Sequence, residues 1–338
     1  MNIKRISLFL SILLLCSNLS ATTQKDKVIR AAIDIGMGGP KLQVAEIDTK
    51  TNQIVKILHT QRYFVNFYDS ISRNPNNNLS SEVMTEGHKA FKEAIDMAYS
   101  FDTDRIVAIA TASFRSAANG EQFAHEIQNE TGIKVHIVDQ NLEGKLAFQA
   151  ILSKIDIVAE NLVVWDVGGG SIQFITMAPD GSCIVDCGEE GVGIFTDYII
   201  EKIQHRNIEE CGSPNPMSIE DINQATAYAR NLSKKIHGIF KEKISRSTTL
   251  IVGAGSVFGY GIAKILNKNL LTIEDLTLAV ENLAGKTDAD LGGGDYAFCE
   301  GSNLILVLGF MQILNIQQMQ IINVNNADGA LIYEPFWQ

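Results

Sequence analysis

The chain lacks the features that direct a protein to nucleic acid or, beyond its N-terminus, into a membrane. Its 338 residues include 28 lysines and arginines against 39 aspartates and glutamates, a formal net charge of −11 at pH 7. Such a chain repels a phosphate backbone overall, and no recognised nucleic-acid-binding motif is present, so we expect no nucleic-acid partner. No long segment after the N-terminus is predicted to span a membrane, and we expect no stable membrane insertion of the mature chain.

Proline is also scarce, with six residues, and no Pro- or Ser-rich linker interrupts the chain. Repeated strand and helix patterns and a hydrophobic content of 46% are enough for two cores. We predict an N-terminal domain at 28–150 and a C-terminal domain at 151–338, joined without a flexible tether.

Cysteine is sparse, with five residues. Cys183 and Cys187 do not have the spacing of a zinc site, and in an extended strand they lie too far apart for a disulfide. Together with Cys211 and Cys299 they permit three pairings in an oxidising compartment, but buried free thiols are the simpler expectation.

Residues 1–21 have the pattern of a secretory signal peptide. A basic pair, Lys4-Arg5, precedes an apolar run at 6–16 and small residues up to Ala21. We expect cleavage after Ala21 and a periplasmic or secreted protein, with an uncleaved membrane anchor as the alternative.

The most informative motif is a glycine run between two apolar stretches, at 161–165 and 174–177. Three adjacent glycines remove every Cβ from the predicted turn, so backbone N–H groups can converge on an anion. Asp166 would repel a bare phosphate, which favours a Mg²⁺ ion between them. The alternative is a tight hairpin capped by Asp166. The candidate phosphate-binding residues of this run are Gly168, Gly169, Gly170 and Ser171.

A second element near the start of the mature chain has the same order of strand, aspartate, glycine and strand. The apolar run at 28–36 ends in Asp34-Ile35-Gly36, and residues 41–47 alternate in polarity. Two such hairpins predict duplicated halves that face a shared cleft, a common place for nucleotides and phosphates.

Between the hairpins, a buried-looking strand at 106–110 runs into a loop that ends in Arg115. A guanidinium stays charged and can bind two oxygens of a phosphate, although a surface salt bridge explains a single arginine equally well.

Several of these motifs together resemble the exopolyphosphatase/guanosine pentaphosphate phosphatase (Ppx/GppA) family: Thr111 to Arg115, Asn119-Gly120, Thr131-Gly132, Glu143 and the run from Asp166 to Ser171. The resemblance implies an α/β fold of the actin-like ATPase superfamily, with two ribonuclease H-like domains around a central cleft. It also implies Mg²⁺-dependent removal of terminal phosphate from polyphosphate or a nucleoside polyphosphate. Members often dimerise, so a homodimer is expected.

By this resemblance Glu143 is the catalytic base, Asp34 and Asp166 hold the metal, and Arg115 binds phosphate. A carboxylate base and positive charge are what phosphoanhydride hydrolysis requires. Without the resemblance, Glu143 reads as an exposed acid in the first turn of a helix.

The chain departs from the family pattern at two places. Met37-Gly38-Gly39-Pro40 replaces hydroxyl and amide side chains, so only backbone N–H groups near Gly36, Gly38 and Gly39 remain for phosphate. Gln173 stands where exopolyphosphatases carry a glutamate, and resembles the water-positioning glutamine of ecto-apyrases. The alternatives are therefore an apyrase-like nucleotidase and a catalytically weakened phosphate- or nucleotide-binding protein.

Two further regions are weaker candidates. Gly253, Gly255 and Ser256 follow a third apolar strand and are candidate phosphate-binding residues, although strand-to-helix packing explains these glycines equally well. A polyanion needs local positive charge, and the richest source is a helix predicted from about Ser218. Its basic residues are Arg230, Lys234, Lys235, Lys241, Lys243 and Arg246, for which a solvated face is the simpler interpretation. Gly292 to Gly294 form a loop without an assigned role.

Overall fold

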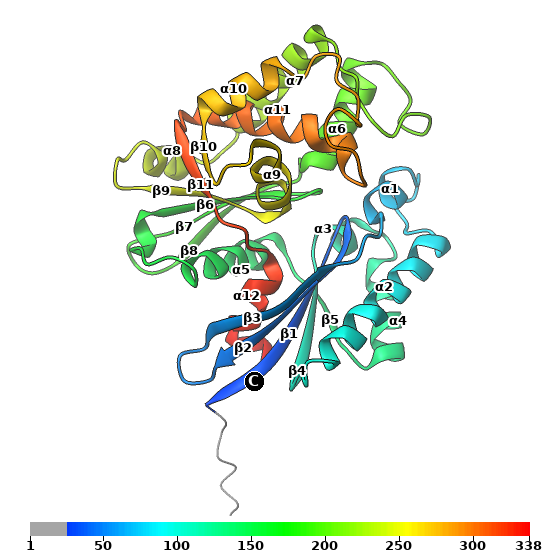
Figure 1. The fold of residues 1–338 in the computed structure, drawn as a ribbon, viewed down its shortest axis with the longest axis vertical. Helices are drawn as coiled ribbons and strands as arrows, with labels where there is room; N and C mark the ends of the chain where they lie inside the picture. Colours follow the sequence, from blue (N-terminus) through cyan, green and yellow to red (C-terminus); the bar gives the residue numbers. More distant parts are fainter. Residues whose placement is uncertain (1–25) are drawn as a thin grey trace, which may run out of the picture.

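The computed structural model describes residues 26–338, so the predicted signal peptide lies outside the described residues. The N-terminal half is built on a five-stranded sheet of order β3-β2-β1-β4-β5 (Figure 1). The strands β1, β2 and β3 form an antiparallel meander, and β4 and β5 continue the sheet in parallel with β1. The strands are β1 (Lys27–Gly36), β2 (Gly39–Asp48), β3 (Gln53–Arg62), β4 (Arg105–Ala110) and β5 (Val135–Ile137). The helices of this half are α1 (Phe67–Ser72), α2 (Ser81–Tyr99), α3 (Ala112–Ser116) and α4 (Gly120–Thr131).

The C-terminal half repeats this plan with a six-stranded sheet of order β10-β11-β9-β6-β7-β8. Here β6, β7 and β8 form the meander, and β9 and β11 continue in parallel. The strands are β6 (Leu162–Val167), β7 (Ile172–Met177), β8 (Cys183–Gly188), β9 (Leu250–Ala254), β10 (Leu270–Thr272) and β11 (Gln318–Ile321). The two meanders confirm the predicted α/β fold with duplicated halves.

Helices cover the second sheet and close its core. They are α6 (Val192–Tyr198), α7 (Ile219–Ser233), α8 (Gly238–Ile244), α9 (Ala263–Leu266), α10 (Ile273–Glu281) and α11 (Ala297–Leu314), with π-helical turns η2 (Ile199–Ile203) and η3 (Val257–Ile262). The helix α11 is long and apolar enough to cross a membrane, but most of it is buried in the core against α7 and α10. In the core of this half, the Trp165 ring of β6 stacks on Phe174 of β7 and on Phe310 of α11.

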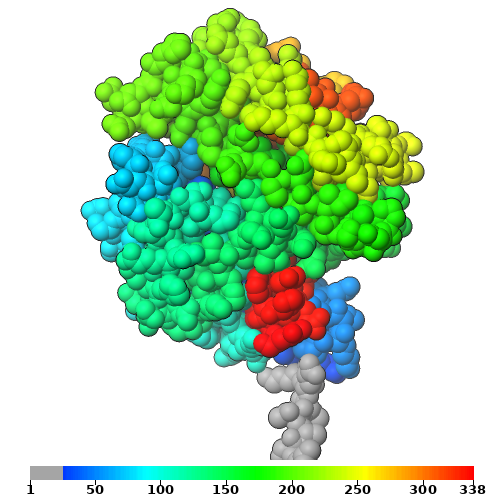
Figure 2. Space-filling model, turned by 180° about the vertical axis from the view of Figure 1, so that it is seen from behind, coloured from blue at the N-terminus to red at the C-terminus, as the bar shows by residue number. Residues whose placement is uncertain are grey.

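The last helix, α12 (Asn326–Ile332), returns to the first sheet. It packs against β1, β2 and α5 (Gln140–Leu152), and Figure 2 shows the C-terminal residues in red beside the blue N-terminal ones. Gly329 makes this approach possible, because a Cβ there would overlap the backbone of Leu146. The predicted boundary at residue 150 falls within α5, and the domain limits remain a prediction. Two short 3₁₀ turns, η1 (Ala159–Asn161) and η4 (Glu334–Phe336), complete the described chain.

The basic helix predicted from Ser218 is in fact two helices. Ser218 caps α7 through a reciprocal capping box with Asp221, but α7 ends at Ser233 and Arg246 lies beyond α8. Lys243 is buried, and its ammonium group donates hydrogen bonds to the Glu160 and Met177 carbonyls. The helix is therefore not a continuous basic face.

All four cysteines within residues 26–338 are free. Cys299 is buried as expected, whereas Cys183 and Cys211 are partly exposed and Cys187 is exposed. Cys183 and Cys187 lie in the extended strand β8, as predicted.

The contact at Gly329 predicts an effect on stability. Gly329→Ala places a methyl group against the Leu146 backbone, which cannot rotate away, and should lower the free energy of unfolding by about 1–3 kcal/mol. Gly238→Ala is the matched control, because a Cβ there meets no atom within 4 Å, and should change stability by less than about 1 kcal/mol. Urea unfolding of both variants measures the difference, and equal midpoints would contradict the close packing of α12.

Candidate active site

The two sheets face each other across a cavity of about 330 Å³. Both Asp-Gly turns line it, as do residues from α5, η3 and the loop before α11. The predicted site residues that line the cavity are Asp34, Gly36, Gly38, Glu143, Asp166, Gly168, Gly169, Gly170, Ser171, Gly255 and Ser256. Gly39, Arg115, Gln173 and Gly253 do not line it.

Asp34 lies near the end of β1 and is almost completely buried. The Lys41 ammonium group, on the neighbouring strand β2, is 3.0 Å from Asp34 Oδ2. Burial lowers the pKa of Lys41, but the charge of Asp34, its hydrogen bond to Lys41 and the nearby Tyr296 together outweigh this effect, and the net pKa is raised. Asp34 Oδ1 is buried and has no hydrogen-bond partner among the described residues. This oxygen is therefore available to a ligand.

Asp166 occupies the equivalent position in β6. Burial raises the pKa of Asp166 to about 6, with Lys41 acting against the shift and Asp34 adding to it. The two carboxylates therefore feel each other's charge across the cavity. Gly255, at φ +83°, lies against this group, because a Cβ there would overlap the Asp166 carboxylate.

Glu143 lies in the first turn of α5, whose N-cap is Asp139. The exposed acid expected from the helix position alone is wrong, since Glu143 is buried at the cavity wall. Arg115 Nη1 is 2.7 Å from Glu143 Oε2, and Asn326 Nδ2 of α12 donates to Oε1 at 3.4 Å. Burial raises the pKa of Glu143 to about 7, although Arg115 opposes the shift.

Arg115 thus holds a carboxylate and lies outside the cavity lining. Its guanidinium also donates to the Val138 carbonyl at 2.8 Å. The structure gives this side chain a positioning contact with Glu143, and the role of a phosphate clamp remains a prediction.

The glycine turn between β6 and β7 has free donors. The Gly168 and Gly169 carbonyls accept hydrogen bonds from the N–H groups of Val192 and Gly193. Within residues 26–338, the Gly169 and Gly170 N–H groups have no hydrogen-bond partner, and both residues line the cavity. Two unpaired N–H groups on a glycine turn are suited to an oxyanion.

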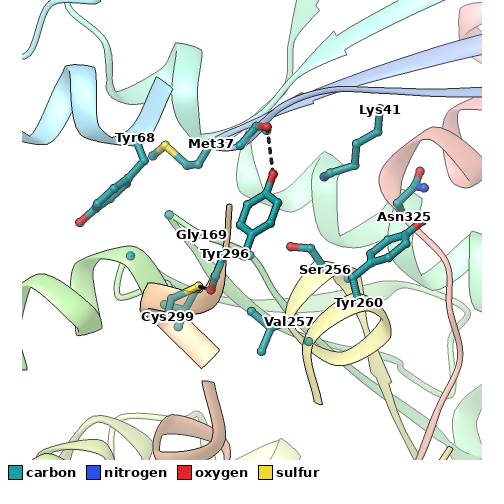
Figure 3. Close-up of a pocket in the computed structure, with 18 of the residues that line it drawn as sticks. Met37, Lys41, Tyr68, Gly169, Ser256, Val257, Tyr260, Tyr296, Cys299 and Asn325 are labelled. Atoms are coloured by element: carbon teal, nitrogen blue, oxygen red, sulfur yellow. Dashed lines mark hydrogen bonds between the residues drawn. The ribbon is translucent and has the colours of Figure 1, made fainter. Parts of the chain in front are cut away.

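Met37 packs directly on this turn. A Cβ on Gly170 would overlap Met37 and Ala112, so the side chain that replaces a hydroxyl in the first turn contacts the second turn instead. In Figure 3 Met37 reaches across the cavity wall toward Tyr68. The two Asp-Gly turns are therefore in apolar contact as well as in electrostatic contact.

The remaining predicted residues support their neighbours. Gln173 is buried and donates from Nε2 to Ser171 Oγ at 3.0 Å. Gly253 leaves room for the side chains of Met319 and Phe258, which favours the packing interpretation. Gly39, at φ +101°, lets the first hairpin approach the Tyr63 carbonyl.

The sequence analysis missed several residues of the cavity wall. Lys41, Arg62, Tyr260 and Tyr296 line it, and so do Gly293 and Gly294 of the loop that had no assigned role. Figure 3 shows the Tyr296 hydroxyl bonded to the first turn, where it donates to the Gly38 carbonyl at 3.2 Å. The triple glycine before Tyr296 was the only signal in the sequence for this wall.

Among the described residues, no group of three or more His, Cys, Asp or Glu side chains is arranged to hold a metal. A bound ion would rely on Asp34 and Asp166, with water or substrate as further ligands. The unpaired Asp34 Oδ1 and the mutual repulsion of the two carboxylates fit a hard divalent cation, which takes oxygen ligands and keeps several waters.

The fold defines the class of protein to which the chain is similar. It matches the solved structure of a Ppx/GppA family member from Aquifex aeolicus with a TM-score of 0.70 and 17% identity, over 92% of this chain and 98% of that one. Residues 44–201 match the model of the Ppx/GppA phosphatase family. The chain is therefore similar to the Ppx/GppA phosphatases, in sequence over residues 44–201 and in fold over most of its length, as the motifs predicted.

Two curated relatives support this conclusion. A bifunctional 3-dehydroquinate synthase/phosphatase from Fusobacterium nucleatum is 29% identical over 156 residues, which cover 44% of this chain and 23% of the relative. A guanosine-5'-triphosphate,3'-diphosphate pyrophosphatase from Pseudoalteromonas translucida is 25% identical over 262 residues, 75% of this chain and 49% of the relative. The matched segments thus span about a quarter and about half of these relatives.

The raised pKa of Glu143 predicts a pH-dependent stability difference. The folded chain holds this proton more tightly than an exposed glutamate of pKa 4.5, so the contribution favours folding at low pH and is lost as pH rises through about 7. Glu143→Gln cannot ionise, so from pH 5 to pH 8 it should gain about 2 kcal/mol relative to the unmodified chain. Urea unfolding in EDTA measures this, with Glu242→Gln as an exposed-charge control. An equal difference at both pH values would rule out a raised pKa.

Proposed function

We propose that the protein is a Mg²⁺-dependent phosphoanhydride hydrolase that releases terminal phosphate from polyphosphate or a related polyphosphorylated substrate. The observation that carries the proposal is the buried Glu143, with a pKa of about 7, in the wall of a cavity that also contains two aspartates and a glycine turn with free N–H groups. A general base works best when its pKa lies near the working pH.

Different residues in and beside the cavity accept the proton, position the base and bind the phosphoryl group. Glu143 accepts a proton from the attacking water, while Arg115 and Asn326 hold its carboxylate in place. The Gly169 and Gly170 N–H groups bind oxygens of the transferred phosphoryl group, where negative charge is concentrated. Burial of the cavity residues strengthens each of these contacts relative to bulk water.

Mg²⁺ is part of the proposal, with Asp34 and Asp166 as its protein ligands. When bound, the ion supplies positive charge that offsets the two carboxylates and the substrate oxygens. Lys41 already contacts one oxygen of Asp34, which leaves Oδ1 and the Asp166 carboxylate for the ion or for its waters.

The substrate follows from the location that we propose. Export to the periplasm or medium rests on residues 1–21, which lie outside the described structure. The Pseudoalteromonas relative is described as acting on guanosine-5'-triphosphate,3'-diphosphate, a cytoplasmic type of nucleotide. An exported enzyme would meet inorganic polyphosphate or extracellular nucleotides instead, and we favour polyphosphate.

A second candidate is a phosphate-chain or nucleotide-binding protein of weak or no activity. Met37 favours this candidate. It stands in the first turn, where the family has hydroxyl or amide side chains, and its apolar side chain covers part of the glycine turn between β6 and β7. The apyrase-like alternative depends on Gln173, but this side chain is buried behind Ser171 and does not reach the cavity.

The hydrolase proposal predicts phosphate release from tripolyphosphate and longer polyphosphate in the presence of Mg²⁺. Glu143→Gln should lower kcat by about 10²- to 10⁴-fold, because it removes the base. Colorimetric phosphate assays on the mature chain measure this, with ATP and ADP as parallel substrates. Glu242→Gln removes a surface acid and should leave kcat unchanged.

Two results would change the assignment. Tight binding of tripolyphosphate without release of phosphate would support the binding protein and overturn the hydrolase. A kcat/KM for ATP and ADP far above that for polyphosphate would support a nucleotidase.

The metal assignment has a test that does not depend on turnover. Mg²⁺ at ten times its dissociation constant should stabilise the chain by about 1.4 kcal/mol, seen as a rise in Tm. Asp166→Asn should abolish that rise, because it removes one of two carboxylate ligands, and Glu242→Gln should keep it. An Mg²⁺-dependent rise that survives Asp166→Asn would place the ion elsewhere.

A further inference from the structure

The strands β2 and β3 place two cations side by side at the cavity. Arg62, the last residue of β3, is the register partner of Lys41. Like charges directly opposite each other on a sheet are destabilising, and the charge of Arg62 lowers the pKa of Lys41. Lys41 is compensated by Asp34, whereas Arg62 has no carboxylate within ion-pair distance among residues 26–338. The uncompensated charge therefore belongs to Arg62.

Two tyrosines from the opposite half hold the Arg62 guanidinium. Its Cζ atom lies over the Tyr260 ring at 4.4 Å from the centroid and over the Tyr296 ring at 5.0 Å. Figure 3 shows these two rings on either side of the space below Lys41. Cation–π contacts fix the plane of a guanidinium while its N–H edge stays free to donate. Arg62 is thus oriented without being neutralised.

This cluster lies in the same cavity as the glycine turn and Glu143. We propose that Arg62, oriented by Tyr260 and Tyr296, forms a second phosphate subsite that binds a phosphate of the substrate that is not transferred. The subsite rests on the proposed function, because it accepts the remainder of a chain whose terminal phosphate lies at the glycine turn. It selects substrates with several linked phosphates over orthophosphate.

The aromatic rings favour a phosphate over a nucleobase at this position. One face of each tyrosine is occupied by the guanidinium, and the Tyr296 ring also makes an edge contact with Phe64 at 5.5 Å. The Tyr296 hydroxyl is bonded to the first turn. To stack on the face of either ring that Arg62 covers, a base would have to displace the guanidinium, whereas a phosphate oxygen needs only its free N–H edge.

The test measures binding in a chain that cannot turn over. In the Glu143→Gln background with Mg²⁺, isothermal titration calorimetry gives Kd for inorganic tripolyphosphate, orthophosphate and ATP. Arg62→Gln should weaken tripolyphosphate binding by about 10- to 100-fold, the range for a charge-assisted hydrogen bond, and change orthophosphate binding by less than about twofold. Arg62→Lys keeps the charge but lacks the two-pronged guanidinium, so its affinity for tripolyphosphate should lie between those of the Arg62 chain and Arg62→Gln.

The matched control is Arg246→Gln, an exposed arginine that pairs with Glu242. It should leave all three affinities unchanged. Tyr260→Phe keeps the ring and should bind tripolyphosphate normally, whereas Tyr260→Leu should weaken it at least about twofold. If Glu143→Gln does not fold, the same titrations with Glu143 intact in EDTA replace it.

The outcomes separate this subsite from the hydrolase itself. Arg62-dependent binding of tripolyphosphate without any phosphate release by the unmodified chain would sustain the subsite and overturn the hydrolase. If the unmodified chain releases phosphate but Arg62→Gln leaves the Kd for tripolyphosphate unchanged, the subsite is overturned and the hydrolase is not. Loss of ATP binding but not tripolyphosphate binding in Tyr260→Leu would assign the rings to a base and also overturn it.

Discussion

Three carboxylates buried around one cavity are the constraint on which the site depends. Asp34, Glu143 and Asp166 are each at most 6% exposed, and buried charges are costly unless they are paired or neutralised. Lys41 and Arg115 offset one carboxylate each, and the pKa values of Glu143 and Asp166 rise because the compensation is incomplete. Three buried carboxylates with incomplete compensation fit the metal and the base that we propose for this cavity.

This constraint also accounts for the path of the chain. The duplicated meanders bring the ends of β1 and β6 to opposite sides of the cavity, but neither supplies the contacts that hold Glu143. Those come from Arg115 of α3 and from Asn326 of α12, a helix that crosses back to the first half, where its Asp328 accepts a hydrogen bond from Gln43 at 2.9 Å. The C-terminal segment thus joins the two halves at the cavity, whose lining includes Asn325 and Asn326.

The sequence predicted the parts of the site that are local. Asp34, Asp166 and their glycines follow from strand periodicity and turn composition within a few residues. Contacts that depend on register or on packing between the halves were not accessible in this way. Arg62 meets Lys41 only because β3 pairs with β2 at one register, and Tyr260 and Tyr296 reach it from elements about 200 residues away. The contact between Arg115 and Glu143 depends in the same way on loop geometry that the sequence does not reveal, and the phosphate-binding role of Arg115 stays a prediction.

The distribution of charge is compatible with the polyanionic substrate that we propose for this acidic chain. The net charge of −11 repels such a ligand over the range of the Debye length, about 8–10 Å at physiological salt. At contact, the local arrangement decides, because a charge pair in a partly buried cleft interacts several times more strongly than one in water. The surface lysines at the end of α7 and in α8, Lys234, Lys235 and Lys241, are already hydrogen-bonded. Arg62, in contrast, is oriented by two rings, has no carboxylate partner among residues 26–338 and lines the same cavity as the glycine turn. The affinity that we propose for the anion is therefore a property of the cavity and not of the acidic exterior.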